Sequence, residues 1–178
     1  STLEELALLQ KLVRGIGSNN VDFRLRQSDF SADGKQSGTP WLGMPIADIN
    51  SCDRFLIVGS FLRKDHPLLA QRVRQAVKKG SQANIIHSAD DELLMNVANK
   101  SIVAPSEITN VLAQVLQALT VETHASLPVE IQHAVATVQL SDKAKAIAHS
   151  LANGERGAVL LGNFAQQHPQ ATQIALLA

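Results

Sequence analysis

The amino-acid sequence predicts an α/β fold of three layers, in which a mostly parallel β-sheet carries helices on both faces. A strand–loop–helix unit occupies residues 53–80, and a shorter copy of it occupies residues 157–178. Apolar strand segments alternate along the chain with segments of helical periodicity, which is typical of parallel α/β proteins. The strand segments are continuously apolar, which indicates a sheet buried on both faces.

The chain before the first copy divides into a helix and a long loop. Residues 2–16 begin with capping-box spacing and carry an apolar stripe, which together predict a helix. Residues 19–24 are compatible with a short strand. Residues 27–45 are rich in Ser, Asp, Gly and Pro and predict a long flexible loop, which we expect Trp41 to pin to the core. A helical turn is expected at residues 46–50.

The first copy predicts a strand, a helix and a second strand. The strand covers residues 55–58, the helix residues 67–79, with proline at its first position, and the second strand residues 83–86. Residues 93–103 leave two alternatives open, namely one short strand or two.

The second half is mostly helical before the repeat returns. Helices are predicted at residues 105–119, 128–138 and 141–154, the last one capped by a serine. A strand at residues 158–161 and a terminal helix from about Pro169 complete the second copy.

In both copies the strand ends at a glycine. Gly59 is followed by Ser60, Gly162 is followed by Asn163, and a phenylalanine comes next in each copy. A His-Pro pair then precedes the helix. Because ligands of parallel sheets bind at the carboxyl ends of the strands, we expect Gly59 and Gly162 to be near neighbours at one edge of the sheet.

Composition excludes several kinds of partner and cofactor. The 178 residues include 16 basic and 16 acidic side chains, so no global field attracts nucleic acid, and we expect no nucleic-acid partner. The one cysteine, Cys52, excludes an intrachain disulfide and a four-cysteine metal site or cysteine-ligated cluster held by this chain alone. No apolar run approaches the roughly 20 residues that span a bilayer, so a soluble chain without membrane insertion is expected.

The two ends of the chain suggest a fragment. The sequence starts at Ser1 without an initiator methionine and stops inside an apolar helical pattern. We therefore expect residues 1–178 to form one α/β domain of a longer protein, and processing of a short natural chain is the alternative.

Motif analysis yields a candidate anion site and no catalytic group. Gly15 and Gly17 follow a helix instead of a strand, which excludes a dinucleotide fingerprint. The six histidines show no metal-ligand spacing, and we expect a surface or capping role for each. Open backbone amides after the strands, with nearby cations and a helix start, could bind an anion. The candidate cofactor-binding residues are Gly59, Ser60, Arg63, Lys64, Gly162 and Asn163.

Four stretches also carry a family resemblance: LIVGSFLRKDHPLLAQRVRQAVKKG, VLLGNFAQQHPQA, and the segments at residues 4–30 and 43–59. They resemble the Rossmann-like nucleotide-fold domain of molybdopterin oxidoreductases, and within that family they are most similar to the large G subunits of bacterial NADH:quinone oxidoreductase (complex I).

The resemblance implies a place in a respiratory complex. Such a subunit lies peripherally on the cytoplasmic side of the inner membrane, among the other subunits of the peripheral arm. Its N-terminal part carries 2Fe-2S and 4Fe-4S clusters that pass electrons from NADH toward quinone. Because this chain lacks those cysteine ligands, it resembles only the C-terminal region.

Two departures from the family pattern concern the cofactor. Phe61 and Phe164 stand where cofactor-binding members have the asparagine of Gly-x-Asn, and His87-Ser88-Ala89 replaces an Asp-Pro-Arg-like run. The favoured hypothesis is therefore a structural, cofactor-free domain. The alternatives are an oxidoreductase domain that still binds a molybdopterin guanine dinucleotide or another nucleotide near Gly59 and Gly162, and a free-standing sensor of a small anion.

Overall fold

A parallel four-stranded sheet forms the centre of the fold. The computed structural model describes residues 2–22, 26, 29–35 and 41–178. The sheet order is β3-β2-β1-β4, and every neighbouring pair is parallel, which confirms the predicted α/β class. The strands are β1 (Arg54–Val58), β2 (Gln82–His87), β3 (Asn99–Ile102) and β4 (Gly157–Leu161).

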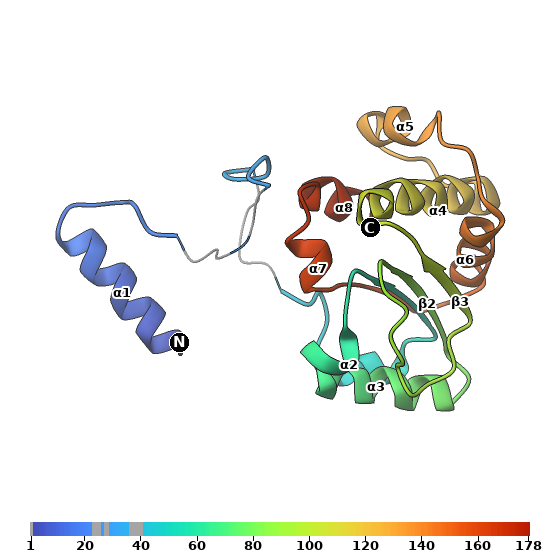
Figure 1. Cartoon of the computed structure of the whole chain (residues 1–178), viewed down its shortest axis with the longest axis horizontal. Coiled ribbons are helices and arrows are strands. Elements are labelled where there is room, and N and C mark those ends of the chain that lie inside the picture. Colours follow the sequence, from blue (N-terminus) through green and yellow to red (C-terminus); the bar gives the residue numbers. More distant parts are fainter. Residues whose placement is uncertain (1, 23–25, 27–28, 36–40) are drawn as a thin grey trace.

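Helices cover both faces of the sheet, which gives the three predicted layers (Figure 1). Phe55 and Ile57 of β1 pack on one side, and Leu56 and Val58 pack on the other, so β1 is apolar throughout. The first face is covered by η1 (Ile46–Ser51) and α3 (Pro67–Lys78). The second face is covered by α4 (Ile108–Thr123), α6 (Asp142–Ala152) and α8 (Ala171–Leu177).

The internal repeat is a structural repeat, with a short helix that the sequence did not predict. In the first copy α2 (Leu62–Asp65) lies between β1 and α3, and in the second α7 (Asn163–Gln166) lies between β4 and α8. The terminal helix expected from about Pro169 occurs, with a slightly later start. Whereas α3 begins at Pro67, α8 begins at Ala171, two residues after Pro169.

Most of the other expected elements occur, with shifted ends. Residues 93–103 hold one strand, β3, and the helix expected from residue 105 starts as a 3₁₀ turn, η2 (Pro105–Glu107), before α4. Helix α5 (Val129–Val135) is shorter than expected. The Ser141 hydroxyl accepts the Ala144 amide proton at 3.2 Å, which confirms the cap of α6.

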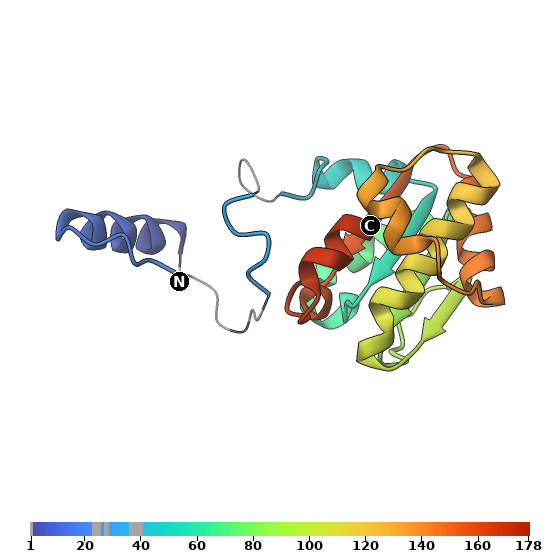
Figure 2. The same cartoon turned by 90° about the horizontal axis from the view of Figure 1, so that it is seen from above.

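The N-terminal helix α1 (Leu3–Gly15) forms with its capping box but buries none of its residues. It stands apart from the sheet and its helices in both views (Figures 1 and 2). Trp41 is 75% exposed, so the expectation that it pins the loop to the core is wrong. Residues 19–22 form no strand. The rest of that predicted strand and residues 27–28 and 36–40 of the predicted loop lie outside the described residues. No helix in the described part of the chain is long and apolar enough to cross a membrane.

One buried amide ties three strands to a helix. Asn84, in the middle of β2, is fully buried. Its Nδ2 donates to the Phe55 carbonyl of β1 at 3.1 Å and to the Ser150 hydroxyl of α6 at 3.0 Å. Its Oδ1 accepts from Asn99 of β3 at 2.8 Å. Because every polar atom of this side chain is paired, it fixes how α6 sits on the sheet.

We expect Asn84→Leu to lower the free energy of unfolding by about 3 kcal/mol, because the groups it binds then stay buried without partners. Urea denaturation followed by circular dichroism measures this loss. Asn96→Leu, at an exposed position, serves as the control and should stay within about 0.5 kcal/mol of the parent. Equal effects of the two changes would contradict a structural role for the Asn84 network.

Candidate functional site at the carboxyl edge of the sheet

The strand order reverses between β1 and β4, where ligands bind in folds of this class. From β1 the chain adds β2 and then β3 on one side, whereas β4 lies on the other side of β1. Val58 pairs with Leu161 in the last rung, and the Gly162 amide donates to the Val58 carbonyl at 2.9 Å. Gly59 and Gly162 are therefore neighbours at one edge, as predicted.

The backbone itself fills the space above Gly59. The Gly59 carbonyl accepts hydrogen bonds from the amides of Phe164 at 3.0 Å and Ala165 at 3.3 Å. Gly59 has φ +56°, and a Cβ added to it would lie 2.6 Å from the Ala165 nitrogen. A Cβ on Gly162 would meet Ser60 in the same way. This junction, formed by Gly59, Ser60, Gly162, Phe164 and Ala165, leaves no room for a side chain at either glycine.

The expectation of open amides at the two glycines is wrong. The Gly59 amide donates to the Ile86 carbonyl of β2 at 2.9 Å, and the Gly162 amide donates to Val58. The parallel ladder thus continues one residue past each strand end and uses the donors that a phosphate would need. Asn163 is an exposed residue at the start of α7.

Four rings lie over this edge. Phe61 meets the His87 ring edge-on at 4.5 Å between centroids, and Phe164 lies 5.7 Å from His87 on a tilted plane. His168 follows at 6.5 Å from Phe164. Phe61 of the first repeat and Phe164 of the second therefore both contact His87, the last residue of β2.

The expectation of a surface or capping role is wrong for His87, which is only 2% exposed. Its Nδ1 accepts the Ala89 amide proton at 2.8 Å, and its Nε2 has no hydrogen-bond partner among the described residues. Burial lowers the pKa of His87 below its ordinary value, partly offset by the carboxylates of Asp91 and Asp65.

His168 is also buried, but both its nitrogens are paired. Its Nδ1 accepts from the Gln170 amide at 3.0 Å, which leaves Nε2–H to donate to the Pro105 carbonyl at 3.0 Å. His168 therefore joins the loop before α8 to the turn before α4.

The predicted loop cations lie on α2 instead of in an open loop. Lys64 is exposed and lies 3.5 Å from a carboxylate oxygen of Asp91, while Arg63 is half-buried. Lys64 also sits 5.6 Å above the Phe61 ring. Asp91 belongs to the acidic run after β2. The ammonium group of Lys64, which could bind the phosphate of a ligand, is thus paired with the Asp91 carboxylate of the same chain.

A cavity of about 640 Å³ opens beside the junction, on the β4 side. Among the described residues that line it, Arg26 is the only charged one, and no sequence pattern connects that residue with the second repeat. The Asp29 carboxylate accepts the Thr172 amide proton near the start of α8 at 2.8 Å, which brings this N-terminal segment to the cavity. Its lining residues are Arg26, Pro105, Ser106, Phe164, Gln167, His168, Pro169 and Gln170.

The hydrogen bond between Asp29 and Thr172 also affects the pKa of the Asp29 carboxyl group. Hydrogen bonds from the Ser31 hydroxyl and from the amides of Thr172 and Ser31 hold the pKa of Asp29 well below its usual range.

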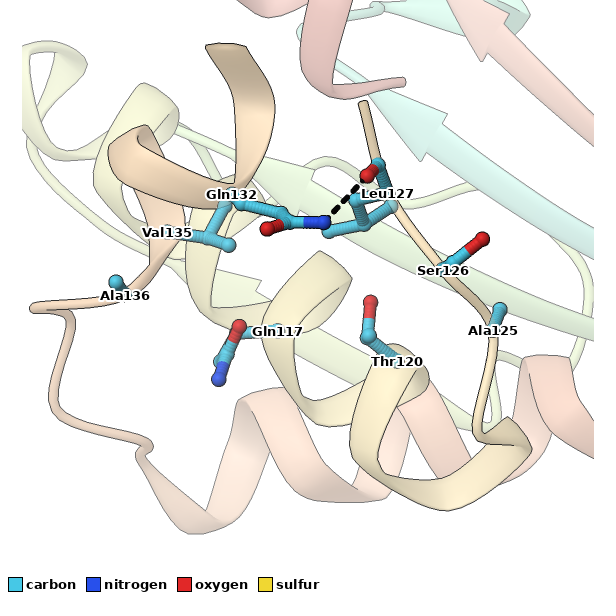
Figure 3. Close-up of a pocket in the computed structure, with 8 residues that line it drawn as sticks. All are labelled: Gln117, Thr120, Ala125, Ser126, Leu127, Gln132, Val135 and Ala136. Atoms are coloured by element: carbon cyan, nitrogen blue, oxygen red, sulfur yellow. Dashed lines mark hydrogen bonds between the residues drawn. The ribbon is translucent and has the colours of Figure 1, made fainter. Parts of the chain in front are cut away.

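A second cavity, of about 250 Å³, lies between α4 and α5 (Figure 3). Gln132 reaches across its wall and donates to the Leu127 carbonyl at 2.6 Å, while the Thr120 hydroxyl donates to the Leu116 carbonyl of its own helix. None of the described residues that line this cavity is charged. Within the described ranges, no group of three His, Cys, Asp or Glu side chains is arranged to hold a metal ion.

Gly59→Ala should lower the free energy of unfolding by about 3 kcal/mol, since it combines positive φ with a backbone contact against α7. Gly80→Ala is the matched control, because Gly80 has φ +107° but open space around its Cβ position; its cost should be about 1 kcal/mol. Chemical denaturation of both variants separates the cost of positive φ from the cost of the collision with α7. Equal losses would show that contact with α7 adds nothing.

Comparison with known proteins adds a family assignment to this geometry. The model of a family described as molybdopterin oxidoreductase matches residues 1–177. The G subunit of the NADH-quinone oxidoreductase of Rickettsia felis (strain ATCC VR-1525 / URRWXCal2) is 32% identical over 80 residues, which cover 45% of this chain and 12% of that protein. The probable oxidoreductase YjgC of Bacillus subtilis (strain 168) is 40% identical over 95 residues, which cover 48% of this chain and 9% of that protein. The chain thus spans a small part of each of these relatives.

Proposed function

Because the chain belongs to the molybdopterin oxidoreductase family, we propose that it is a structural, cofactor-free domain of a G-type subunit of an NADH:quinone oxidoreductase. Residues 1–178 form one α/β domain of that longer subunit. Similarity to the G subunit of such an enzyme supports this assignment. In this proposal the parent complex transfers electrons from NADH to quinone, the domain lies on the cytoplasmic side of the membrane, and its partners are the other subunits of the peripheral arm.

The observation that carries the proposal is the filled junction between the two repeats. Two amides of α7 bind the Gly59 carbonyl, and the amides of Gly59 and Gly162 are used by the sheet. A pterin dinucleotide would need such donors for its phosphates at this edge. The residues present therefore do not fit a phosphate at the two glycines, and we assign them no step in cofactor chemistry.

The chain also does not supply ligands for an iron–sulfur cluster. Cys52 is the only cysteine of the sequence, whereas a cluster is held by several. Cys52 is buried, and burial raises the pKa of its thiol, which disfavours the thiolate that binds metal. In our proposal the 2Fe-2S and 4Fe-4S clusters belong to another part of the parent subunit.

Ligand titration tests the proposal directly. We expect GMP, GDP and tetrahydrobiopterin at millimolar concentration to shift the melting temperature of the 178-residue chain by less than about 1 °C. A specific ligand at 100 times its dissociation constant would add roughly 2.7 kcal/mol, which corresponds to about 5 to 10 °C for a chain of this size. A shift of that size would overturn the cofactor-free assignment.

A paired variant tests the role of the rings. The double change Phe61→Asn and Phe164→Asn introduces amides at the positions where the family pattern has asparagine. If ring bulk alone blocks binding, this variant should show the nucleotide shift that the parent lacks. If backbone closure blocks it, as the junction suggests, the variant should not bind either.

The second candidate is an oxidoreductase domain that still binds a molybdopterin guanine dinucleotide or another nucleotide. One observation favours it: the cavity of about 640 Å³ beside the junction falls in the size range of small-molecule sites and is lined in part by Arg26. A thermal shift that Arg26→Gln abolishes would support this candidate over the structural one.

A further inference from the structure

His87 is a buried titratable residue at the meeting point of three segments. It ends β2, and the phenylalanine rings that follow β1 and β4 in the two repeats both contact its ring. Its backbone carbonyl accepts the Val103 amide proton at 3.0 Å, which fixes its position beside the end of β3. The ring therefore has little freedom to leave this place without moving Phe61 or Phe164.

The hydrogen bonds of His87 define which ring nitrogen carries the proton. Nδ1 accepts the Ala89 amide proton at 2.8 Å, so it must hold a lone pair, and the neutral ring carries its proton on Nε2. Nε2–H has no acceptor among the described residues. Within that part of the chain the ring makes a single hydrogen bond, and that bond holds the start of the loop at residues 88–92.

A second proton would convert this attraction into a repulsion. Protonation places a hydrogen on Nδ1, and an imidazolium has two donors and no acceptor. The Ala89 amide would then face another N–H at hydrogen-bond distance, so either the ring or the loop must move. Because Phe61 and Phe164 hold the ring, the loop is the part that gives way.

We propose that His87 is a proton-operated latch, whose neutral ring holds the loop of residues 88–92 through the Ala89 amide and whose protonation at Nδ1 releases that loop. The same loop carries Asp91, which pairs with Lys64 of α2. Releasing it therefore loosens the contact between the loop and the helix that follows Phe61. The latch links solvent pH to the packing of the carboxyl edge.

The charged groups around His87 influence the pH at which the latch opens. Asp65 on α2 and Asp91 on the loop favour the protonated ring, but desolvation outweighs both, so the neutral form persists below the ordinary pKa of histidine. Asp91 is already paired with Lys64 and Asp90 with Lys100 on β3, which weakens their pull on the ring. No charged residue lies on α7.

The free energy of unfolding should also decrease when the pH falls, because acid favours protonated His87. Because the folded chain holds His87 neutral, its contribution to stability is fully present above about pH 6.5 and is lost as the pH falls from there toward the lowered pKa. We therefore expect the latch to open only as the pH falls below the ordinary pKa of histidine, about 6.5.

Amide exchange measured by NMR on the 178-residue chain tests the latch. We expect the protection factor of the Ala89 amide to fall at least tenfold between pH 7 and the acidic pH at which ring resonances show that His87 is protonated. His87→Asn keeps an acceptor oxygen near the position of Nδ1 without a titratable ring, so its Ala89 protection should change less than twofold. His149→Asn, which removes an exposed histidine paired with Glu122, should behave like the parent.

Two results would overturn the proposal. One is an Ala89 amide that stays protected at a pH where ring resonances show that His87 is protonated. The other is an equal loss of protection in His87→Asn, which would place the acid effect elsewhere. If His87→Asn does not fold, the ¹⁵N spectrum of the parent decides, since a His87 ring protonated on Nδ1 at pH 7 would rule out the latch.

Discussion

The carbonyl of Gly59 accepts hydrogen bonds from two consecutive amides of α7, and the arrangement of the carboxyl edge depends on this contact. It joins the end of β1 to the segment after β4, which lie about a hundred residues apart in the chain. A glycine is needed there because the backbone has φ +56° and a side chain would collide with Ala165. The two halves of the repeat are thereby locked together where a related fold would admit a ligand.

The same pairing of polar groups extends to the charges and rings around the junction. Lys64 pairs with Asp91, and Lys100 pairs with Asp90, so cations and acids near the strand ends neutralise one another. Phe61 and Phe164 cover His87. Polar groups at this edge are thus bonded to one another within the chain, where they hold the fold. The His87 ring contacts both phenylalanine rings, and in our proposal its protonation releases the loop of residues 88–92.

Much of the architecture follows from local patterns in the sequence. The strands β1, β2 and β4, the helices that cover the sheet and the cap of α6 were predictable because apolar periodicity and capping residues act within a few positions, whereas residues 93–103 left one strand or two open. The proximity of Gly59 and Gly162 was predictable as well, since parallel strands place their carboxyl ends at one edge. The helices α2 and α7 were missed because four residues are too few to show a helical period.

The sequence by itself determined the fold class, the repeat and the side of the sheet where its glycines meet. Only the tertiary structure decided that their amides are used, because the acceptors Ile86 and Val58 come from neighbouring strands. It likewise decided that Trp41 is exposed, that His87 is buried, and that α1 stands apart from the sheet. These properties depend on contacts between distant segments, and a local pattern identifies an apolar face without identifying what packs against it.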